Sequence, residues 1–227
     1  EGTGNYDIST AGKSIVIRSW NGAANTVINT RGAGSGFLIS NGETTNTVIK
    51  GFSITTTLNS CSDGDCDQEE AIVVTGSSPV IQDCRIYQCE LSGIVCKQGA
   101  APVIENCVIE YTRRGIEAFN STPVIKNCRI SNIGNGLAGG AGVGIYSSGS
   151  TGLVVQATTV SNCLGRGAVV INDPGALIKE SVFVKNRGGL TLDGSGSLID
   201  RCIIRGNQSP TYYTDQRGAW VGTHRLD

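Results

Sequence analysis

Pro102-Val-Ile-Glu-Asn-Cys-Val-Ile109 is repeated along this chain with only small changes. Three close copies are Pro79-Val-Ile-Gln-Asp-Cys-Arg-Ile86, Pro123-Val-Ile-Lys-Asn-Cys-Arg-Ile130 and Ser197-Leu-Ile-Asp-Arg-Cys-Ile-Ile204. The steps from Val80 to Val103 and on to Val124 are 23 and 21 residues, and the steps from the fainter copies at Val154 and Leu177 to the close copy at Leu198 are the same two. The repeating unit is therefore about 22 residues long, and two longer steps mark insertions.

A second repeat runs in phase with the first and adds another short segment to each unit. Its copies are Gly36-Phe-Leu-Ile39, Ala71-Ile-Val-Val74, Gly93-Ile-Val-Cys96, Gly115-Ile-Glu-Ala118, Gly144-Ile-Tyr-Ser147, Ala168-Val-Val-Ile171 and Gly189-Leu-Thr-Leu192. Gly, Asn, Asp and Ser separate these segments, and helical periodicity is missing. So short a unit cannot bury its apolar side alone, but it can when it stacks on similar neighbours. The sequence therefore predicts an all-β solenoid.

The repeats resemble those of the right-handed parallel β-helix family, which includes pectate, alginate and chondroitin lyases, phage tailspikes and many microbial surface proteins. The resemblance covers roughly residues 11–207. It implies a single domain over residues 1–227, with 208–227 as a C-terminal tail outside the repeat. It implies a fold and not a function, because this scaffold carries enzymes, adhesins and structural fibres alike.

The composition fits a turn-rich β protein with a thin aliphatic core. The chain has 32 glycines, no methionine, 5% aromatic and 16% charged residues. A net charge of −1, with no basic cluster beyond Arg113 and Arg114, argues against nucleic acid and anionic membranes as partners. No stretch is long and apolar enough to span a bilayer. Because the first residue is Glu1 and methionine is absent, we expect a processed leader or a truncation, and an extracellular or cell-surface location.

Four of the nine cysteines occupy one position of the repeat: Cys84, Cys107, Cys128 and Cys202. An isoleucine follows two residues after each of them on the same strand face, so all four thiols are expected to point inward and to be reduced. Stacked coils about 4.8 Å apart would align them in a buried ladder of small apolar groups. Such a ladder requires neither metal binding nor redox chemistry.

Cys61 and Cys66 lie instead in the first insertion, within Cys61-Ser-Asp-Gly-Asp-Cys66. A disulfide that closes this short loop is expected in an oxidising compartment. A zinc pair is disfavoured by the spacing and because no histidine is near. A different set of equivalent turn positions holds Cys89, Cys163, Asn186 and Asn207. This equivalence predicts a rank of small polar groups that caps the turn, and not a bonded cysteine pair.

The first insertion also gathers five carboxylates within eight residues: Asp63, Asp65, Asp67, Glu69 and Glu70. Hard oxygen ligands at such spacing can collect around Ca²⁺. The segment matches only the first half of an EF-hand loop, since it lacks the glycine at the sixth position and the distal glutamate. Two readings stay open, a solvated acidic loop tied by a disulfide and a weak calcium site. Neither reading requires a cofactor for the fold.

The two insertions, residues 57–70 and 133–142, end just before equivalent strands three coils apart, so we expect them to flank a groove roughly 14 Å wide. Side chains expected along it are Lys97, Arg113, Arg114, Glu117, Phe119 and Tyr146. In the lyases that the repeats resemble, substrate lies along such a face, with calcium and a basic residue near the sugar carboxylate. The resemblance would give that part to Lys97, Arg113 or Arg114.

Several features argue against an enzyme. The sequence lacks the Trp-Asp-His and Arg-x-Pro-x-x-Arg motifs of the main pectate lyases, and the Asn-Thr-Asp, Asp-Asp and Gly-His-Gly set of the polygalacturonases. Glycoside hydrolysis needs two carboxylates, but Glu117 has Val95 and Tyr146 as its outward neighbours. We expect Arg113 and Arg114 to form surface ion pairs with Glu90 or Glu117. No catalytic residue is therefore assigned.

Strand alternation in the second repeat predicts which side chains face the core. The inward set is Ile72, Val74, Ile94, Cys96, Ile116, Ile145, Val169 and Ile171, and the outward set is Leu38, Val73, Val95, Tyr146 and Val170. A contiguous exposed apolar strip usually marks a contact surface. Coil ends without a cap, and a tail with Tyr212, Tyr213 and Trp220, also favour association with a copy of this chain or with another chain.

The sequence thus favours an extracellular, non-catalytic β-solenoid, either a surface or fibre-forming structural protein or its binding module, that associates with itself or with another chain. The second hypothesis is a polysaccharide lyase or related uronate-active enzyme that works in the groove between the insertions. Asn120-Ser-Thr122 and Asn207-Gln-Ser209 are glycosylation acceptors in a host that glycosylates.

Overall fold

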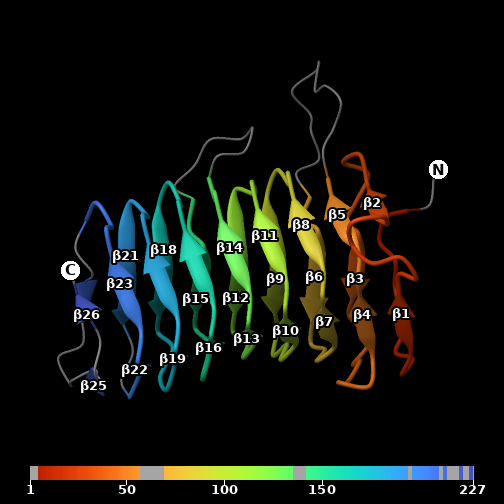
Figure 1. Cartoon of the computed structure of the whole chain (residues 1–227). Helices are drawn as coiled ribbons and strands as arrows, with labels where there is room; N and C mark the ends of the chain where they lie inside the picture. The colour runs from red at the N-terminus through yellow and green to blue at the C-terminus, as the bar shows by residue number, and fades with distance from the viewer. Residues whose placement is uncertain are drawn as a thin grey trace.

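In the computed structural model the chain winds into a stack of coils, and each full coil gives one strand to each of three parallel sheets (Figure 1). The structure describes residues 5–56, 69–134, 142–193 and 196–209, and the backbone of three short strands beyond them. These parts consist of strands and turns without a helix, so none of them holds a helix that could cross a membrane. The prediction of an all-β parallel β-helix is confirmed.

Each sheet collects every third strand. Sheet 1 consists of β1 (Val16–Arg18), β4 (Val48–Lys50), β7 (Val80–Gln82), β10 (Val103–Glu105), β13 (Val124–Lys126), β16 (Val154–Gln156), β19 (Leu177–Lys179), β22 (Leu198–Asp200) and β25 (Trp220–Val221). Sheet 2 consists of β2 (Val27–Asn29), β5 (Ser53–Thr55), β8 (Arg85–Tyr87), β11 (Val108–Glu110), β14 (Arg129–Ser131), β17 (Thr159–Ser161), β20 (Val182–Val184), β23 (Ile203–Arg205) and β26 (Arg225–Leu226). Sheet 3 consists of β3 (Phe37–Ile39), β6 (Ile72–Thr75), β9 (Ser92–Lys97), β12 (Arg114–Phe119), β15 (Ile145–Ser148), β18 (Arg166–Ile171), β21 (Gly188–Asp193) and β24 (Tyr212–Tyr213).

The core consists of aliphatic ladders that run along the stack. In sheet 1 the middle residue of each Val-Ile-x strand points inward, so that Ile81, Ile104 and Ile125 lie in register and are fully buried. Identical side chains at successive coils pack against one another, because parallel strands place equivalent residues about 4.8 Å apart. Where Phe183 enters the core, the neighbouring corner holds Gly167, which leaves room for the ring.

The chain turns at corners where one residue of each coil has a positive φ. Between sheets 1 and 2, for example, Asn106, Asn127 and Ala157 have φ of 55°, 54° and 49°. Asn tolerates this left-handed conformation better than other residues with a Cβ, which accounts for its recurrence at the corners. The Asn-Cys pair of the repeat is therefore a corner followed by an inward side chain.

The corner that leads into sheet 3 has no room for a Cβ. A Cβ built on Gly115 would lie 2.2 Å from the carbonyl oxygen of Gly144 and 2.8 Å from the Cγ2 of Ile130. In the next coils this position is held by Gly144 and then Gly167, not by Ala168. The alignment of the second sequence repeat, which placed Ala168 in line with Gly144, was therefore shifted by one residue in this coil.

This shift corrects three expected orientations. Ala168 and Val170 face the core, and Val170 is fully buried, whereas Val169 and Ile171 are half-buried in the outward row, opposite Tyr146 and Ser148. The outward position assigned to Val170 and the inward positions assigned to Val169 and Ile171 are thus wrong. The physical reason is that the glycine, and not the first aliphatic residue, fixes where the strand bends.

The backbone of the C-terminal tail pairs with the coil before it. The strands β24, β25 and β26 pair in parallel with β21, β22 and β23, so each sheet gains one more strand after residue 208. The backbone of these three short strands continues the parallel pairing, although the aliphatic sequence repeat ends before them. The aromatic residues Tyr212, Tyr213 and Trp220 concealed the continuation, because they replace the aliphatic side chains by which the repeat is recognised.

A buried carboxylate holds the N-terminal coils together. Glu43 accepts hydrogen bonds from Thr10 Oγ1 at 2.6 Å, Gly12 N at 2.9 Å, Asn41 N at 2.8 Å and Ser77 Oγ at 2.9 Å. Burial alone would raise the pKa of Glu43, but these hydrogen bonds outweigh it and lower the pKa from 4.5 to about 2. Glu43 is therefore ionised and links three consecutive coils.

Candidate functional site

The outer face of sheet 3 brings three of the expected site residues together. The guanidinium of Arg114 donates from Nη1 to Glu117 Oε1, and Ser92 Oγ donates to Glu117 Oε2. The carbon of the same guanidinium lies 5.4 Å from the ring centroid of Tyr146. Ser92 and Arg114 lie opposite each other in β9 and β12, while Glu117 lies opposite Tyr146 in β15. Strand register alone therefore builds the cluster.

An aromatic pair extends this cluster. The rings of Phe119 and Tyr146 have centroids 5.6 Å apart at an interplanar angle of 51°. Lys97, which is exposed, lies opposite Phe119 in β9. The face therefore combines two cations, two aromatic rings and a carboxylate that is already hydrogen-bonded, and such a surface can stack against and orient a sugar ring or another planar group.

Arg113 is not part of this cluster. Its amide donates to Leu91 O at 3.0 Å from the turn before β12. The Arg114–Glu117 contact is an ion pair of the kind expected from the sequence. Among the residues that lie opposite Glu117 in the strand register, Val95 and Tyr146, neither is acidic.

These contacts limit what Glu117 can do chemically. Its side chain is 9% exposed, and each of its oxygens accepts a hydrogen bond, one of them from a cation. Both carboxylate oxygens are therefore already occupied by donors from the chain itself. The geometry suits positioning or binding better than general acid catalysis.

The acidic insertion lies mostly outside the described residues. Asp63, Asp65 and Asp67 are among them, as are Cys61 and Cys66, so the calcium site and the disulfide stay predictions. Glu69 and Glu70 are described and half-buried, and Glu69 O accepts a hydrogen bond from Thr56 Oγ1 at 3.4 Å. Within the described ranges, no group of three or more His, Cys, Asp or Glu has the geometry to hold a metal ion.

Both insertions precede strands of the same sheet, as expected. Sheet 3 has the order β15-β12-β9-β6, so β6 and β15, which follow residues 57–70 and 133–142, are three strand steps apart. Three steps of about 4.8 Å separate them by roughly 14 Å.

The expected apolar strip on sheet 3 is not exposed. Val73 and Val95 lie outside the core cluster but are only 5% and 4% exposed, Leu38 is half-buried, and Val170 belongs to the core. Neighbouring rows on a closely spaced parallel sheet cover one another's flanks, which strand alternation alone does not reveal. The strip is therefore a poor contact surface.

The thiol ladder lies where the repeat placed it. Cys84, Cys107, Cys128 and Cys202 are buried and free, and each Sγ lies within 3.9 Å of a carbonyl oxygen of the preceding coil. Hydrogen bonds with Cys128 and Cys84, together with burial, raise the pKa of Cys107 well above its ordinary value. Burial likewise raises the pKa of Cys202, so Cys107 and Cys202 are protonated packing groups at neutral pH. The hydrogen bond with Cys107 instead lowers the pKa of Cys84 and Cys128.

The polar rank at the corner after sheet 2 has a defined bonding pattern. Asn186 Oδ1 accepts from Cys163 N at 3.0 Å, and Asn207 Oδ1 accepts from Asn186 N at 2.9 Å. The amide nitrogens of the two asparagines donate to Val160 O and Phe183 O, both at 3.1 Å. Cys89 and Cys163 are free thiols at this rank.

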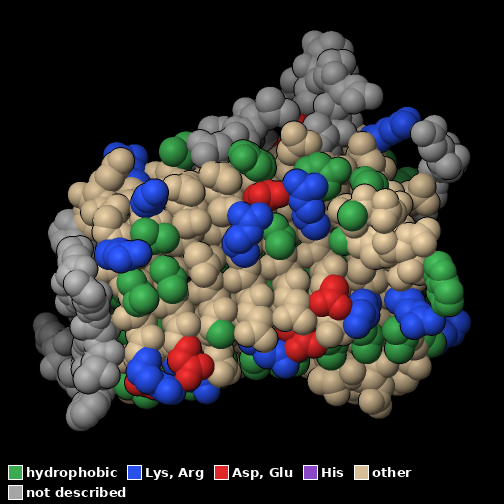
Figure 2. All heavy atoms as spheres, in the orientation of Figure 1, with side chains coloured by type: hydrophobic (Ala, Val, Ile, Leu, Met, Phe, Trp, Pro, Cys, Tyr) green, Lys and Arg blue, Asp and Glu red, His purple; other side chains and the backbone are tan. Residues whose placement is uncertain are grey.

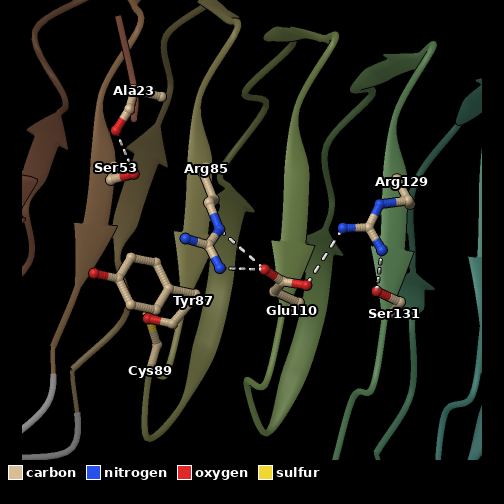
Figure 3. A network of polar contacts seen from close by, with 8 residues as sticks. All are labelled: Ala23, Ser53, Arg85, Tyr87, Cys89, Glu110, Arg129 and Ser131. Atoms are coloured by element: carbon tan, nitrogen blue, oxygen red, sulfur yellow. Dashed lines mark hydrogen bonds and ion pairs between the residues drawn. The ribbon is translucent and has the colours of Figure 1, made fainter. Parts of the chain in front are cut away.

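A second polar cluster, on sheet 2, was not found from the sequence. Figure 2 shows an acidic group between two basic groups near the middle of the visible face, and Figure 3 identifies such a set as Glu110 between Arg85 and Arg129. Glu110 Oε1 accepts from Arg85 Nε at 3.0 Å and Nη2 at 2.7 Å, and Oε2 accepts from Arg129 Nη2 at 3.4 Å. Arg129 also donates to Ser131 Oγ at 3.1 Å. The signal was available in the repeat, since Arg85 and Arg129 hold the same position two coils apart.

Comparison with known proteins agrees with this architecture. The family described as "Right handed beta helix region" matches residues 2–143 and 123–221. No curated protein and no solved structure gives a significant match. Together the two matched segments span most of the chain, and the chain belongs to the family of proteins with a right-handed β-helix region.

Proposed function

We propose that this chain is a non-catalytic β-solenoid that acts outside the cell as a structural or binding module and associates with copies of itself. The observation that carries association is the distribution of exposed apolar side chains. Trp20 is 85% exposed, Val16 58% and Val27 53%, and Tyr6 and Ile15 of the same coil are exposed as well. In the other described coils the large exposed apolar residues are Tyr111, Leu164 and Ile203.

The edges of strands β1 and β2 also favour association at this first coil. Among the strands that the structure describes, β1 pairs only with β4 and β2 pairs only with β5. Each therefore presents backbone donors and acceptors on one side, and such edges readily pair with another chain. Val16 lies on β1, Val27 lies on β2, and Trp20 follows β1. A second copy that covered this coil would satisfy the backbone and bury apolar area worth roughly 25 cal/mol per Å².

Light scattering coupled to size-exclusion chromatography tests the association. The 227-residue chain is expected to exceed its monomer mass of 23.6 kDa at high micromolar concentration. A Val16→Glu/Val27→Glu variant should be monomeric, because it places charges on both edges. Tyr111→Ser removes an exposed apolar side chain elsewhere and should associate like wild type. A monomeric wild-type chain, or association that survives in the edge variant, contradicts the proposal.

A location outside the cell is supported by the family resemblance to microbial surface proteins. Antibody labelling of intact and of permeabilised source cells distinguishes the alternatives. Equal labelling of intact and permeabilised cells is expected, and labelling that requires permeabilisation contradicts an outer location.

The alternative function is a polysaccharide lyase on the outer face of sheet 3. The observation in its favour is that Arg114, Tyr146 and Lys97 converge there, since a lyase needs cations near the uronate carboxylate and a base. The test is absorbance of the unsaturated product from polygalacturonate or alginate, with and without Ca²⁺. Product release that is lost in Arg114→Ala would put this function first, and no release from either polymer would leave the non-catalytic proposal in place.

Calcium binding by Asp63, Asp65, Asp67, Glu69 and Glu70 is supported by their charge density alone. Titration calorimetry with Ca²⁺ at millimolar concentration tests it, with Asp63→Asn/Asp65→Asn as the matched variant. Heat of binding that disappears in the variant supports the site, and heat equal in both chains contradicts it.

A further inference from the structure

We propose that the C-terminal end of sheet 2 is a docking surface for an acidic protein segment that also carries apolar side chains. The surface consists of Lys185, Arg187 and Arg205 with Ile203 and Leu164, and we call it the basic end of sheet 2. All five side chains are exposed. It lies far along the stack from the first coil and does not depend on the association proposed above.

Strand register brings these residues together from three coils. Val184 lies opposite Arg205, so Lys185 comes immediately after the neighbour of Arg205. The amide of Lys185 donates to Arg205 O at 3.4 Å, and the amide of Arg187 donates to Cys163 O at 3.0 Å, which sets Arg187 beside Leu164. Residues up to 41 positions apart in the sequence, from Leu164 to Arg205, thus form one surface.

The turn beneath these side chains is tied to its neighbours by hydrogen bonds. Asn186 stands between Lys185 and Arg187, is buried, and both accepts from Cys163 N and donates to Val160 O. Asn207 caps Asn186 from the next coil. A partner would therefore bind cations whose backbone is already ordered, so little conformational entropy is lost in the turn.

Charge on this surface is of one sign. In the described parts of the chain, Lys185, Arg187 and Arg205 form none of the ion pairs, whereas at sheet 1 Lys50 pairs with Asp83 at 3.2 Å and Lys126 pairs with Glu105 at 2.6 Å. Figure 2 shows basic side chains without an acidic one among them at the upper left of the visible face, toward its C-terminal end, while lower at the same end basic and acidic groups lie together. In a chain of net charge −1, this local excess favours an anionic partner.

The apolar side chains decide which kind of anion fits. Leu164 is 49% and Ile203 40% exposed, and both lie beside the cations. A uniformly charged polymer would pair with the cations but leave these two side chains in water. A peptide in which Asp or Glu alternates with apolar residues would cover both, with arginine as the preferred carboxylate partner.

Fluorescence anisotropy with labelled short peptides tests the proposal. The probes are peptides of alternating Glu and Leu, matched peptides with Gln in place of Glu, polyglutamate and heparin. We expect the Glu-Leu peptides to bind best and to weaken with salt. Arg187→Glu/Arg205→Glu should weaken their binding by about tenfold or more. Lys13→Glu/Arg31→Glu makes the same charge change at exposed positions elsewhere and should have little effect.

The apolar part is tested with Ile203→Ser. It should weaken the Glu-Leu peptides and leave polyglutamate unchanged, and thermal melts establish that each variant is folded. Failure of every Glu-Leu peptide to bind, or equal binding of the Gln peptides, overturns the proposal. Equally tight heparin binding that is indifferent to Ile203→Ser would assign the surface to a linear polyanion instead. Loss of self-association in the Arg187→Glu/Arg205→Glu variant, without loss of peptide binding, would assign it to a second copy.

Discussion

The left-handed corners are the most demanding positions for single residues, because a Cβ at positive φ costs about 1–2 kcal/mol unless the residue is Gly or Asn. Ala157 has a φ of 49° at a corner where the two preceding coils have Asn. Ala157→Asn should therefore raise the free energy of unfolding by about 0.5–1 kcal/mol, and Asn127→Ala should lower it by a similar amount. Urea denaturation of the two variants checks this, and equal stability in both would contradict the role given to the corner.

Glu43 makes the free energy of unfolding depend on pH in the acidic range. Its pKa in the folded protein is about 2, below the ordinary 4.5, so its contribution is complete above pH 4.5 and is lost as the pH falls toward 2. Glu43→Gln should destabilise the protein near neutral pH by about 1–3 kcal/mol, because four hydrogen bonds to a charged group are weakened. The difference from wild type should shrink as the pH falls through this window. A difference that is constant with pH would show that packing, and not the charge, is responsible.

The buried thiols limit the stability of the folded protein at alkaline pH. Burial raises the pKa of Cys89, Cys96 and Cys163 to about 12, whereas the unfolded chain ionises its thiols near 9. The stabilisation by protonated thiols is therefore complete below pH 9 and is lost as the pH rises toward 12. At neutral pH, iodoacetamide should label these thiols in the native protein far more slowly than in urea. Mass spectrometry of the labelled peptides checks this, and rapid native labelling would contradict their burial.

At the scale of the strand and its corner, the glycine before each sheet 3 strand fixes the shape of the coil. Gly115→Ala should be strongly destabilising, by about 2–4 kcal/mol, because the Cβ meets a carbonyl oxygen of the next coil and neither backbone can yield. Gly175→Ala is the matched control, since Gly175 has a φ of 80° but no atom within 4 Å of an added Cβ. It should cost only the conformational strain of about 1–2 kcal/mol. A loss at Gly115 that is no larger than the loss at Gly175 in thermal unfolding would show that small shifts relieve the close approach and that the contact does not require glycine.

The same corner explains how far the elements could be predicted. The Val-Ile-x strands and the inward cysteines follow from identity at a fixed interval, which survives small errors of alignment. The orientation of Val169 and Val170 does not, because a shift of one residue exchanges the two faces of a strand. Gly165-Arg166-Gly167 offered two glycines, and only the close approach of backbones shows that Gly167 occupies the corner.

The two candidate sites likewise differ in how far the sequence could predict them. The meeting of Arg114, Glu117 and Tyr146 could be predicted, since all three follow from strand order and alternation. The basic end of sheet 2 could not, because Lys185, Arg187 and Arg205 are isolated in the sequence and their neighbours matter as much as their own positions. Burial of Val73 and Val95 was missed for the same reason.

For the whole molecule, each coil is held mainly by its two neighbours, so stability should vary along the stack. Amides of β10 and β11, which are paired on both sides, should exchange with solvent more slowly than those of β1 and β2. Hydrogen exchange read by mass spectrometry checks this. Protection of β1 and β2 that rises with protein concentration is expected if copies associate there, and uniform protection along the chain would contradict the coil-by-coil account.

The repeated corners also fix the spacing between surface features along the stack. Because every coil enters and leaves with the same geometry, duplication of one unit of about 22 residues would add one increment of about 4.8 Å and leave the rest of the stack unchanged. Such a duplication between β6 and β15 would move the two insertions apart by that increment, and one after β15 would move only the basic end of sheet 2 away from both. Spacing between surface features is thus inherited as a whole number of coils, and it can be altered in evolution or in the laboratory without any change to the core.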